Sequence, residues 1–243
     1  MGSIVGKENV AEPAFSILLQ RSSGDVKTSY ELREYGKRFV AEVCYSDPNN
    51  TSSPFQTLAR YIGVFGNPQN EGIESIPMTA PEAMDTKGVP IAMTAPVVMD
   101  NYTKGAQIAM TAPVVMENSS PGMKDYKRMK FFLPAEYDDL SKIPKPTNPA
   151  VKIAEVPPAV GAVHRYNGSF SDSINEKMAL DLAAQLREDG IQRLDDEYTK
   201  RNFEFWGYNP PFTLPMFRRN EVWLELTQEE VEMLQQKYNE NHD

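Results

Sequence analysis

The chain has 243 residues, a formal net charge of −9 and 40% apolar residues, which indicates a soluble globular protein with a sizeable core. The negative charge argues against nucleic acid as a partner, because a phosphate backbone is bound by clustered Lys and Arg. Its single cysteine excludes an intrachain disulfide, and no apolar run reaches the roughly 20 residues of a membrane helix. We therefore expect a cytoplasmic protein.

The first half is predicted to contain several strands and one helix. A strand is expected over 14–20, and alternation of apolar and polar residues on both sides of Gly36 predicts a hairpin. Over 54–65 the apolar residues take the spacing of a helix, and Pro54 suits the first helical position, so a helix is expected there.

The second half repeats this order. A strand is expected over 126–137, and Pro157 and Pro158 separate two more strands. A long helix is expected over 173–189, with Ser173 and Glu176 as its capping box and Gly190 as its stop. A strand, a proline-rich loop, a closing strand and a short tail helix follow.

The order ββ-α-ββ therefore occurs twice. It predicts an α+β fold of two similar halves, with an antiparallel sheet that curls toward a barrel. We expect a flexible leader over 1–13, one domain over 14–226, and a C-terminal helix and tail over 227–243.

The segment 76–116 contains three copies of the sequence MTAP, which begin at Met78, Met93 and Met110. Three copies are too few and too short for a solenoid, so we interpret them as strand-and-turn units added to a sheet. Methionine sulfur can ligate copper or heme iron, but no Cys or His stands nearby and Met also fills irregular apolar gaps. Packing is the favoured role.

Several motifs together resemble the SOUL heme-binding protein family. These are YELREYGKRFVAEV, LARYIGVFGNPQNEGIESIPMTAPE, KFFLP, HRYNGSFSD and YNPPFTLPMFRRNEVWLEL, which follow one another in the family's order over about 28–226. The tandem IAMTAP copies resemble those of plant-type cytosolic members, with 91–107 as the expected extra copy. The resemblance implies a distorted antiparallel β-barrel of two pseudo-repeated halves flanked by two main helices, similar to the effector-binding domains of bacterial drug-sensing regulators. It also implies non-covalent binding of heme or another tetrapyrrole.

A heme site needs an apolar slot and cations for the propionates. The predicted helix offers an apolar wall and one cation, and the resemblance implies that this helix borders the site. The proline-rich loop offers further apolar bulk. For any single apolar residue of the helix or the loop, ordinary packing is an equally good explanation. The candidate residues are Phe55, Leu58, Arg60, Ile62 and Phe65 on the helix, and Tyr208, Phe212, Leu214, Met216 and Phe217 on the loop.

His164 is the candidate axial ligand of the heme iron, although a strand histidine is more often hydrogen-bonded. His242 lies close to the C-terminus. Cys44, Tyr35 and Tyr61 are weaker candidates.

Catalytic motifs are not found, so we expect no enzyme. Glu221 can act as a pocket acid or base, but an ion pair with Arg218 or Arg219 is the favoured interpretation. The sequence predicts a cytosolic heme carrier or buffer, and it leaves two alternatives. One is a small-molecule hydrolase that uses a pocket carboxylate, and the other is an interaction scaffold that uses the MTAP copies.

Overall fold

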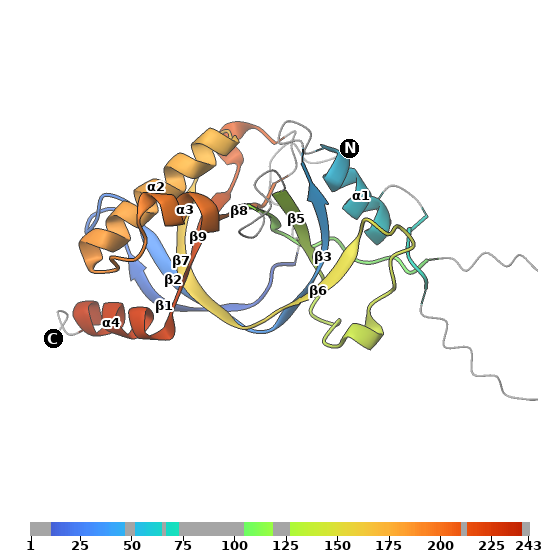
Figure 1. The fold of residues 1–243 in the computed structure, drawn as a ribbon, viewed down its shortest axis with the longest axis horizontal. Coiled ribbons are helices and arrows are strands. Elements are labelled where there is room, and N and C mark those ends of the chain that lie inside the picture. The colour runs from blue at the N-terminus through green and yellow to red at the C-terminus, as the bar shows by residue number, and fades with distance from the viewer. Residues whose placement is uncertain are drawn as a thin grey trace, which may run out of the picture.

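The computed structural model describes residues 11–46, 52–64, 67–72, 105–118, 127–209 and 213–239, which form one curled antiparallel sheet covered by helices (Figure 1). The strands in chain order are β1 (Phe15–Arg21), β2 (Tyr30–Tyr35), β3 (Arg38–Tyr45), β4 (Val114–Asn118), β5 (Lys127–Phe132), β6 (Lys152–Val156), β7 (Ala159–Tyr166), β8 (Glu204–Gly207) and β9 (Asn220–Leu226). The helices are α1 (Ser52–Ile62), α2 (Asp172–Asp189), α3 (Asp196–Asn202) and α4 (Gln228–Asn239), with short 3-10 turns η1 (Leu140–Lys142) and η2 (Pro215–Phe217).

The sheet is built from two equivalent halves. Its strand order is β1-β2-β7-β9-β8-β4-β5-β3-β6, so β2, β7, β9 and β8 on one side of the centre mirror β6, β3, β5 and β4 on the other. Helix α1 follows β3 as α2 follows β7. The α+β class and the two related halves are confirmed. The sheet curls like a barrel but does not close, because the described parts of β1 and β6 remain edge strands.

The predicted hairpin on both sides of Gly36 is wrong. Strand β2 pairs with β1 and β7, whereas β3 pairs with β5 and β6, so the two strands belong to opposite halves. Alternation predicted each strand correctly, but it carries no information about the partner. Pairing with distant strands replaces the local turn here, as it does on both sides of Pro157 and Pro158.

The helix ends follow capping rules, with one shift. Thr227 and Glu230 form a capping box at the start of α4, with nitrogen–oxygen distances of 2.8 and 3.3 Å. Gly190 ends α2 with a φ of 126°, which favours glycine. The cap of α2 is Ser171 rather than the predicted Ser173, because the helix begins at Asp172. Helix α3 was not predicted from the sequence.

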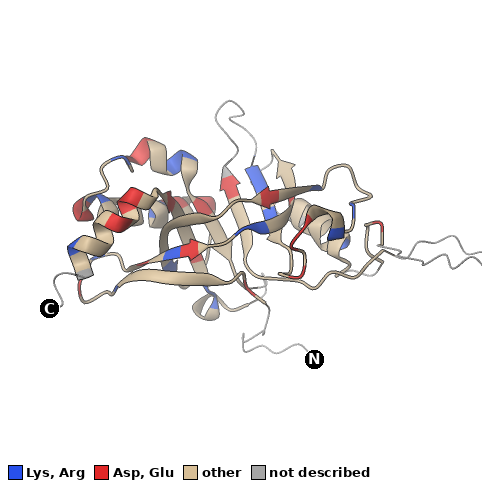
Figure 2. Ribbon diagram, turned by 90° about the horizontal axis from the view of Figure 1, so that it is seen from below, with Lys and Arg blue, Asp and Glu red and all other residues tan. Residues whose placement is uncertain are grey.

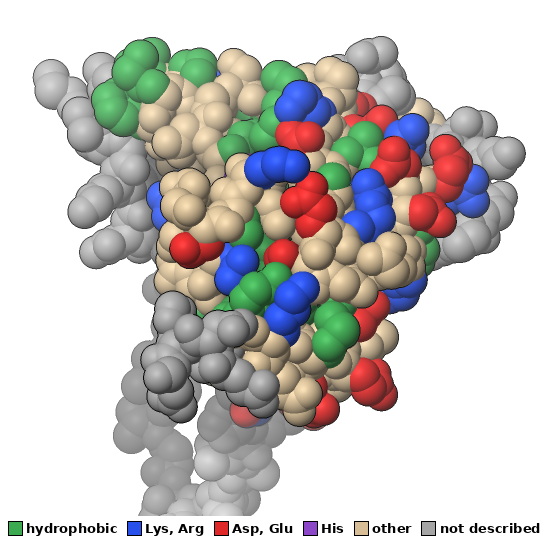
Figure 3. Space-filling model, turned by 90° about the vertical axis from the view of Figure 1, so that its left-hand side faces the viewer, with side chains coloured by type: hydrophobic (Ala, Val, Ile, Leu, Met, Phe, Trp, Pro, Cys, Tyr) green, Lys and Arg blue, Asp and Glu red, His purple; other side chains and the backbone are tan. Residues whose placement is uncertain are grey.

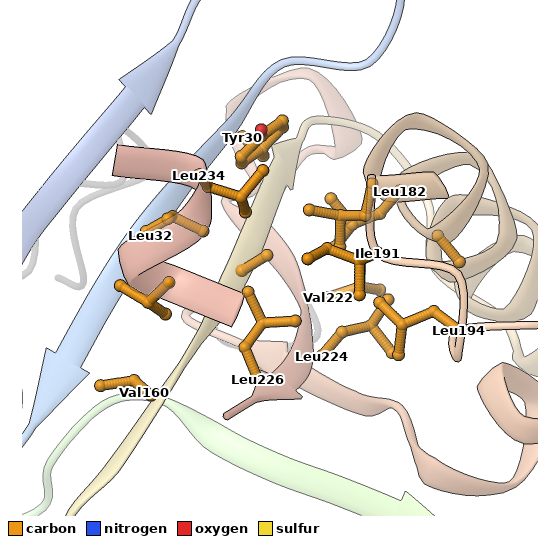
Figure 4. Packing of buried hydrophobic residues seen from close by; sticks show 14 of the residues in the cluster. Tyr30, Leu32, Val160, Leu182, Ile191, Leu194, Val222, Leu224, Leu226 and Leu234 are labelled. Atoms are coloured by element: carbon orange, nitrogen blue, oxygen red, sulfur yellow. The ribbon is translucent and has the colours of Figure 1, made fainter. Parts of the chain in front are cut away.

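The outer face of the sheet carries the helices. Leucines of α2 and α4, such as Leu182 and Leu234, point toward Leu32, Leu224 and other residues of β2, β7 and β9 (Figure 4). Truncation of one such leucine to alanine is expected to cost about 2–5 kcal/mol. Helix α1 covers the other half and packs on β3 and β5.

The inner face of the sheet is aromatic. The ring of Tyr35 on β2 lies 5.3 Å from Trp206 on β8, although two strands separate β2 from β8 in the sheet. Trp206 also stacks on Trp223 and meets the edge of Phe132, at 5.5 and 5.7 Å between ring centroids. These contacts require strong curling, and they fill the space that the curl encloses.

The third MTAP copy forms the centre of the sheet. Strand β4 pairs with β5 and β8, and Val115 is 1% exposed. Before it, the Ile108 amide donates to the Ile62 carbonyl at 3.1 Å, and the Thr111 hydroxyl donates to the Phe132 carbonyl at 2.5 Å. Met116 packs against the cluster under α1, as expected for a packing methionine, whereas Met110 is 38% exposed. The first two copies lie outside the described residues.

Deletion of residues 91–107 is expected to leave the fold intact. The sequence IAMTAPVVM occurs identically at 91–99 and 108–116, so the deletion keeps one copy in front of Glu117. The free energy of unfolding should fall by only about 1–2 kcal/mol, because the Gln107 side chain that donates to the Gly63 carbonyl is lost, whereas loop closure varies by only about 0.6 kcal/mol per doubling of loop length. Urea denaturation measures this value. Trp206→Ala, expected to lose about 3–5 kcal/mol, is the reference for a damaged centre. A comparable loss in the deletion variant would contradict this account.

Candidate functional site

Most of the apolar residues of α1 that were predicted to line a heme site are instead packed in the core. Leu58 and Ile62 are 0% and 2% exposed, and both belong to the core between α1 and the sheet. Phe55 is half-buried, and its ring meets the edge of Phe131 at 5.3 Å. Arg60 is exposed and makes no side-chain hydrogen bond or ion pair with the described residues. The helix therefore presents Arg60 and part of Phe55 to solvent.

The loop between β8 and β9 presents apolar side chains to solvent. Leu214, Met216 and Phe217 are 46%, 68% and 51% exposed, and they lie in and beside η2. Exposed apolar groups that are contiguous mark binding surfaces more often than isolated ones do. Two further candidates, Phe65 and Phe212, lie outside the described residues.

Internal contacts hold this loop in place. The Arg218 guanidinium lies 5.3 Å from the centre of the Phe170 ring, and its Nε donates to the Thr213 carbonyl at 2.8 Å. Phe170 stacks on Phe205 of β8 at 5.2 Å. The Gly168 amide donates to the Pro215 carbonyl at 2.9 Å. These contacts anchor the described part of the loop, 213–219, which carries the exposed apolar side chains.

Helix α1 and this loop lie at the same end of the sheet. The last residue of β8, Gly207, pairs with Val114, the first residue of β4. The segment that enters β4 binds the end of α1, where Gln107 Nε2 donates to the Gly63 carbonyl at 3.0 Å. The structure thus places Arg60 and the loop at the same end of the sheet.

His164 lies elsewhere. It is on the outer face of β7, four strand spacings from β5, which α1 covers. At about 4.8 Å per strand, this is about 19 Å along the sheet. Its Nδ1 lies 2.7 Å from the Ser29 carbonyl, so Nδ1 carries the proton and donates to that oxygen. His164 is therefore on the half of the sheet opposite to α1, and that half also carries the β8–β9 loop.

The structure also shows where the weaker candidates for an iron ligand lie. Tyr35 and Tyr61 are buried, and Tyr61 donates to the Pro144 carbonyl at 2.8 Å. Cys44 is exposed on β3, at a distance from the loop. His242 lies outside the described residues. Among the residues that the structure describes, no group of three or more His, Cys, Asp or Glu side chains is arranged to hold a metal ion.

Glu221 is the centre of an ion-pair network on the inner face. It is fully buried and accepts from Arg33 at 2.8 Å, from Arg219 at 2.9 Å and from the Tyr208 hydroxyl at 2.8 Å. Burial alone would raise the pKa of Glu221, but the bonds from Arg33, Arg219 and Tyr208 hold it below its ordinary value. The expected pairing with Arg219 is confirmed, and Arg33 was missed because its partner is 188 residues away.

A second charged group lies on the inner face where β4 meets β8. Glu117 is paired with Glu204 across the strands, and Lys130 lies 2.6 Å from Glu117 and 3.6 Å from Glu204. Burial raises the pKa of Glu204 to about 7, and Lys130 opposes this. Lys130 is only 12% exposed, so its charge is largely withdrawn from solvent. Residues of opposite charge also adjoin on the central strands in Figure 2.

The solved structures with a similar fold share little sequence with this chain and superpose on it only in part. The C-terminal domain of EcmrR has a TM-score of 0.46 at 10% identity, and the match covers 82% of this chain and 98% of that domain. A hydrolase from Listeria innocua gives 0.43 at 13% identity, with coverage of 82% and 91%. SAV2435 bound to tetraphenylphosphonium gives 0.38 at 10% identity, with coverage of 83% and 95%. These values are too low to support any functional argument, and the search of curated proteins finds no match.

The family comparison is decisive. The model of the SOUL heme-binding protein matches residues 10–106 and again 99–225. The two ranges meet in the tandem MTAP copies and together extend over most of the chain. The chain therefore belongs to the SOUL heme-binding protein family.

Proposed function

We propose that the protein binds heme or a related tetrapyrrole reversibly and acts as a carrier or buffer. The ring lies against the exposed apolar residues of the β8–β9 loop, and Arg60 or Arg218 pairs with a propionate. The observation that carries this proposal is the exposure of Leu214, Met216 and Phe217 on the anchored segment 213–219. Membership of the SOUL family supports heme as the class of ligand.

The residues fit the ring better than they fit the iron. Apolar side chains and arginines suit a flat ring with two carboxylates, and burial of the ring supplies the driving force. His164 lies on β7, opposite Val222 of β9, and its Nδ1 already donates to the Ser29 carbonyl. When bound, heme supplies its own redox and ligand chemistry, and the protein contributes reversible storage.

A hydrolase is the less favoured function. Its candidate acid or base, Glu221, is held ionised by two arginines and is fully buried, so it has no proton to donate and little access to a substrate. An interaction scaffold is the other alternative. Because the third copy alone supplies β4, the deletion of 91–107 separates the two ideas: a carrier keeps heme binding, whereas a scaffold loses its partner.

We further propose that the carrier works in the cytoplasm. Its single cysteine, Cys44, is a free thiol, which suits a reducing compartment. Within the part of the chain that the structure describes, no helix has the length and apolarity needed to span a bilayer.

Combined substitution of Met216→Ala and Phe217→Ala is expected to weaken hemin binding about tenfold or more, because each side chain loses apolar contact with the ring. Absorbance titration in the Soret region measures the affinity. Leu140→Ala is the matched control, since Leu140 is 53% exposed on η1. Equal affinities for the loop variant and the control would place the ring elsewhere.

Iron should contribute little to affinity. Protoporphyrin without iron is expected to bind within about threefold of hemin, because burial of the ring dominates. His164→Ala should leave the Soret maximum of the hemin complex unchanged. Fluorescence quenching and absorbance measure the two affinities. A loss of about tenfold or more without iron, or a shifted Soret band in the variant, would reveal an axial ligand.

Glu221→Gln should destabilise the protein by about 3–5 kcal/mol, because Arg33 loses its buried counter-charge. The lowered pKa of Glu221 stabilises the wild type at neutral pH, and this contribution disappears as the pH falls below the unfolded value of about 4.3. The free energy of unfolding of the variant should therefore change less than that of the wild type as the pH falls. Denaturation across pH measures both effects. Glu225→Gln, at an exposed position of the same strand, should change stability by less than about 0.5 kcal/mol.

A further inference from the structure

Residues 11–14, which precede β1, cross the concave inner side of the sheet. Ala11 forms a parallel bridge with Thr111, and the Ala112 amide donates to the Ala11 carbonyl at 3.0 Å, so the segment joins the edge strand β1 to the residues that enter β4. Strands β1 and β4 are five strand spacings apart in the sheet order, which is about 24 Å along the sheet. Ala11 and Phe15 are at most about 14 Å apart, even in a fully extended chain. The segment therefore takes a short path across the curl, and we call it the strap.

The strap places the Glu12 carboxylate on Arg219, the residue that directly precedes β9. Arg219 Nη1 donates to Glu12 Oε1 at 2.8 Å and to Oε2 at 3.1 Å. Arg219 is the only partner of the Glu12 side chain among the described residues. The Glu12 and Arg219 side chains are 35% and 21% exposed, and ion pairs at such exposed positions contribute little to stability. Another carboxylate can therefore replace Glu12 at low cost.

Arg219 keeps its orientation without Glu12. Its Nε donates to the buried Glu221 carboxylate at 2.9 Å, and its guanidinium carbon lies 3.7 Å from the centre of the Tyr208 ring. Its backbone amide donates to Asn209 Oδ1 at 2.6 Å. These contacts hold the guanidinium in place, so a carboxylate that binds Nη1 does not have to order the side chain. Arg219 is thus a preorganised carboxylate site that the chain's own Glu12 occupies.

Arg219 lies beside the proposed tetrapyrrole surface. It follows Phe217 by two residues, so the two Cα atoms are at most about 7 Å apart. Phe217 is 51% exposed, and a ring that lies against it brings its propionates to the end of the sheet where Arg219 lies. The chain has a net charge of −9, and on the side of the molecule where α4 lies Figure 3 shows Lys and Arg side chains among Asp and Glu. A propionate therefore depends on individual arginines rather than on a broad positive surface.

We propose that the strap is autoinhibitory: Glu12 occupies Arg219 in the free protein, and a propionate of the tetrapyrrole replaces Glu12 on binding. The inference rests on the proposed function, because it adds a carboxylate partner and a regulatory contact to the same site. The exchange keeps the ion pair between Arg219 and Glu221 and transfers only Nη1 from Glu12 to the ligand. The strap lowers the affinity of the carrier and favours release of its ligand.

Fluorescence titration with iron-free protoporphyrin, at constant ionic strength, tests the strap. Glu12→Gln should bind protoporphyrin about threefold to fivefold more tightly than the wild type, because the competing carboxylate is lost. Glu34→Gln removes the same charge from an exposed position on β2 and should bind like the wild type. Thermal melting checks that both variants fold.

The dimethyl ester of protoporphyrin is the second ligand, because it keeps the ring and has no free carboxylate. The wild type and Glu12→Gln should bind the ester with equal affinity. Equal affinities of Glu12→Gln and Glu34→Gln for protoporphyrin, or the same gain for the ester, would overturn the strap and leave the proposed function standing. Absence of protoporphyrin binding by the wild type and both variants would instead contradict the proposed function, and the strap with it.

Discussion

The pairing of β4 with β8 holds the two halves of the sheet together and thereby positions the β8–β9 loop. These two short strands join the halves at the centre of the sheet. On the inner face, Val115 and Trp206 pair there, and the stack of aromatic rings around Trp206 sets the curl. On the outer face, Met116 pairs with Phe205, which supports Phe170 beneath the β8–β9 loop. The same junction therefore fixes the fold and the proposed binding surface.

Charge is organised around this junction. The inner face buries Glu221 between arginines and places Glu117, Glu204 and Lys130 together. The outer face has apolar cores beneath its helices. Among the described candidates for an iron ligand, Tyr61 and His164 are hydrogen-bonded to backbone carbonyls. The apolar side chains of the β8–β9 loop remain exposed, and the proposed function rests on them.

Much of the fold could be predicted because alternation, caps and proline positions are local signals. The two halves, the end of α2 at Gly190 and the capping box of α4 were all accessible in this way. The partner of β2 was not, since alternation does not encode which strand lies alongside. The sequence correctly indicated that Met216 and Phe217 lie on a loop. It did not show that Leu58 is buried in the core or that Arg33 binds Glu221, because both depend on which distant elements pack together.

In the proposed complex, a tetrapyrrole lies against the β8–β9 loop. Methyl-labelled methionine NMR tests it directly, because the ring current of a porphyrin shifts nearby methyl signals. Addition of iron-free protoporphyrin should shift the Met216 methyl strongly and leave the Met233 methyl, on exposed α4, unchanged. An unshifted Met216 signal at saturating ligand would contradict the account.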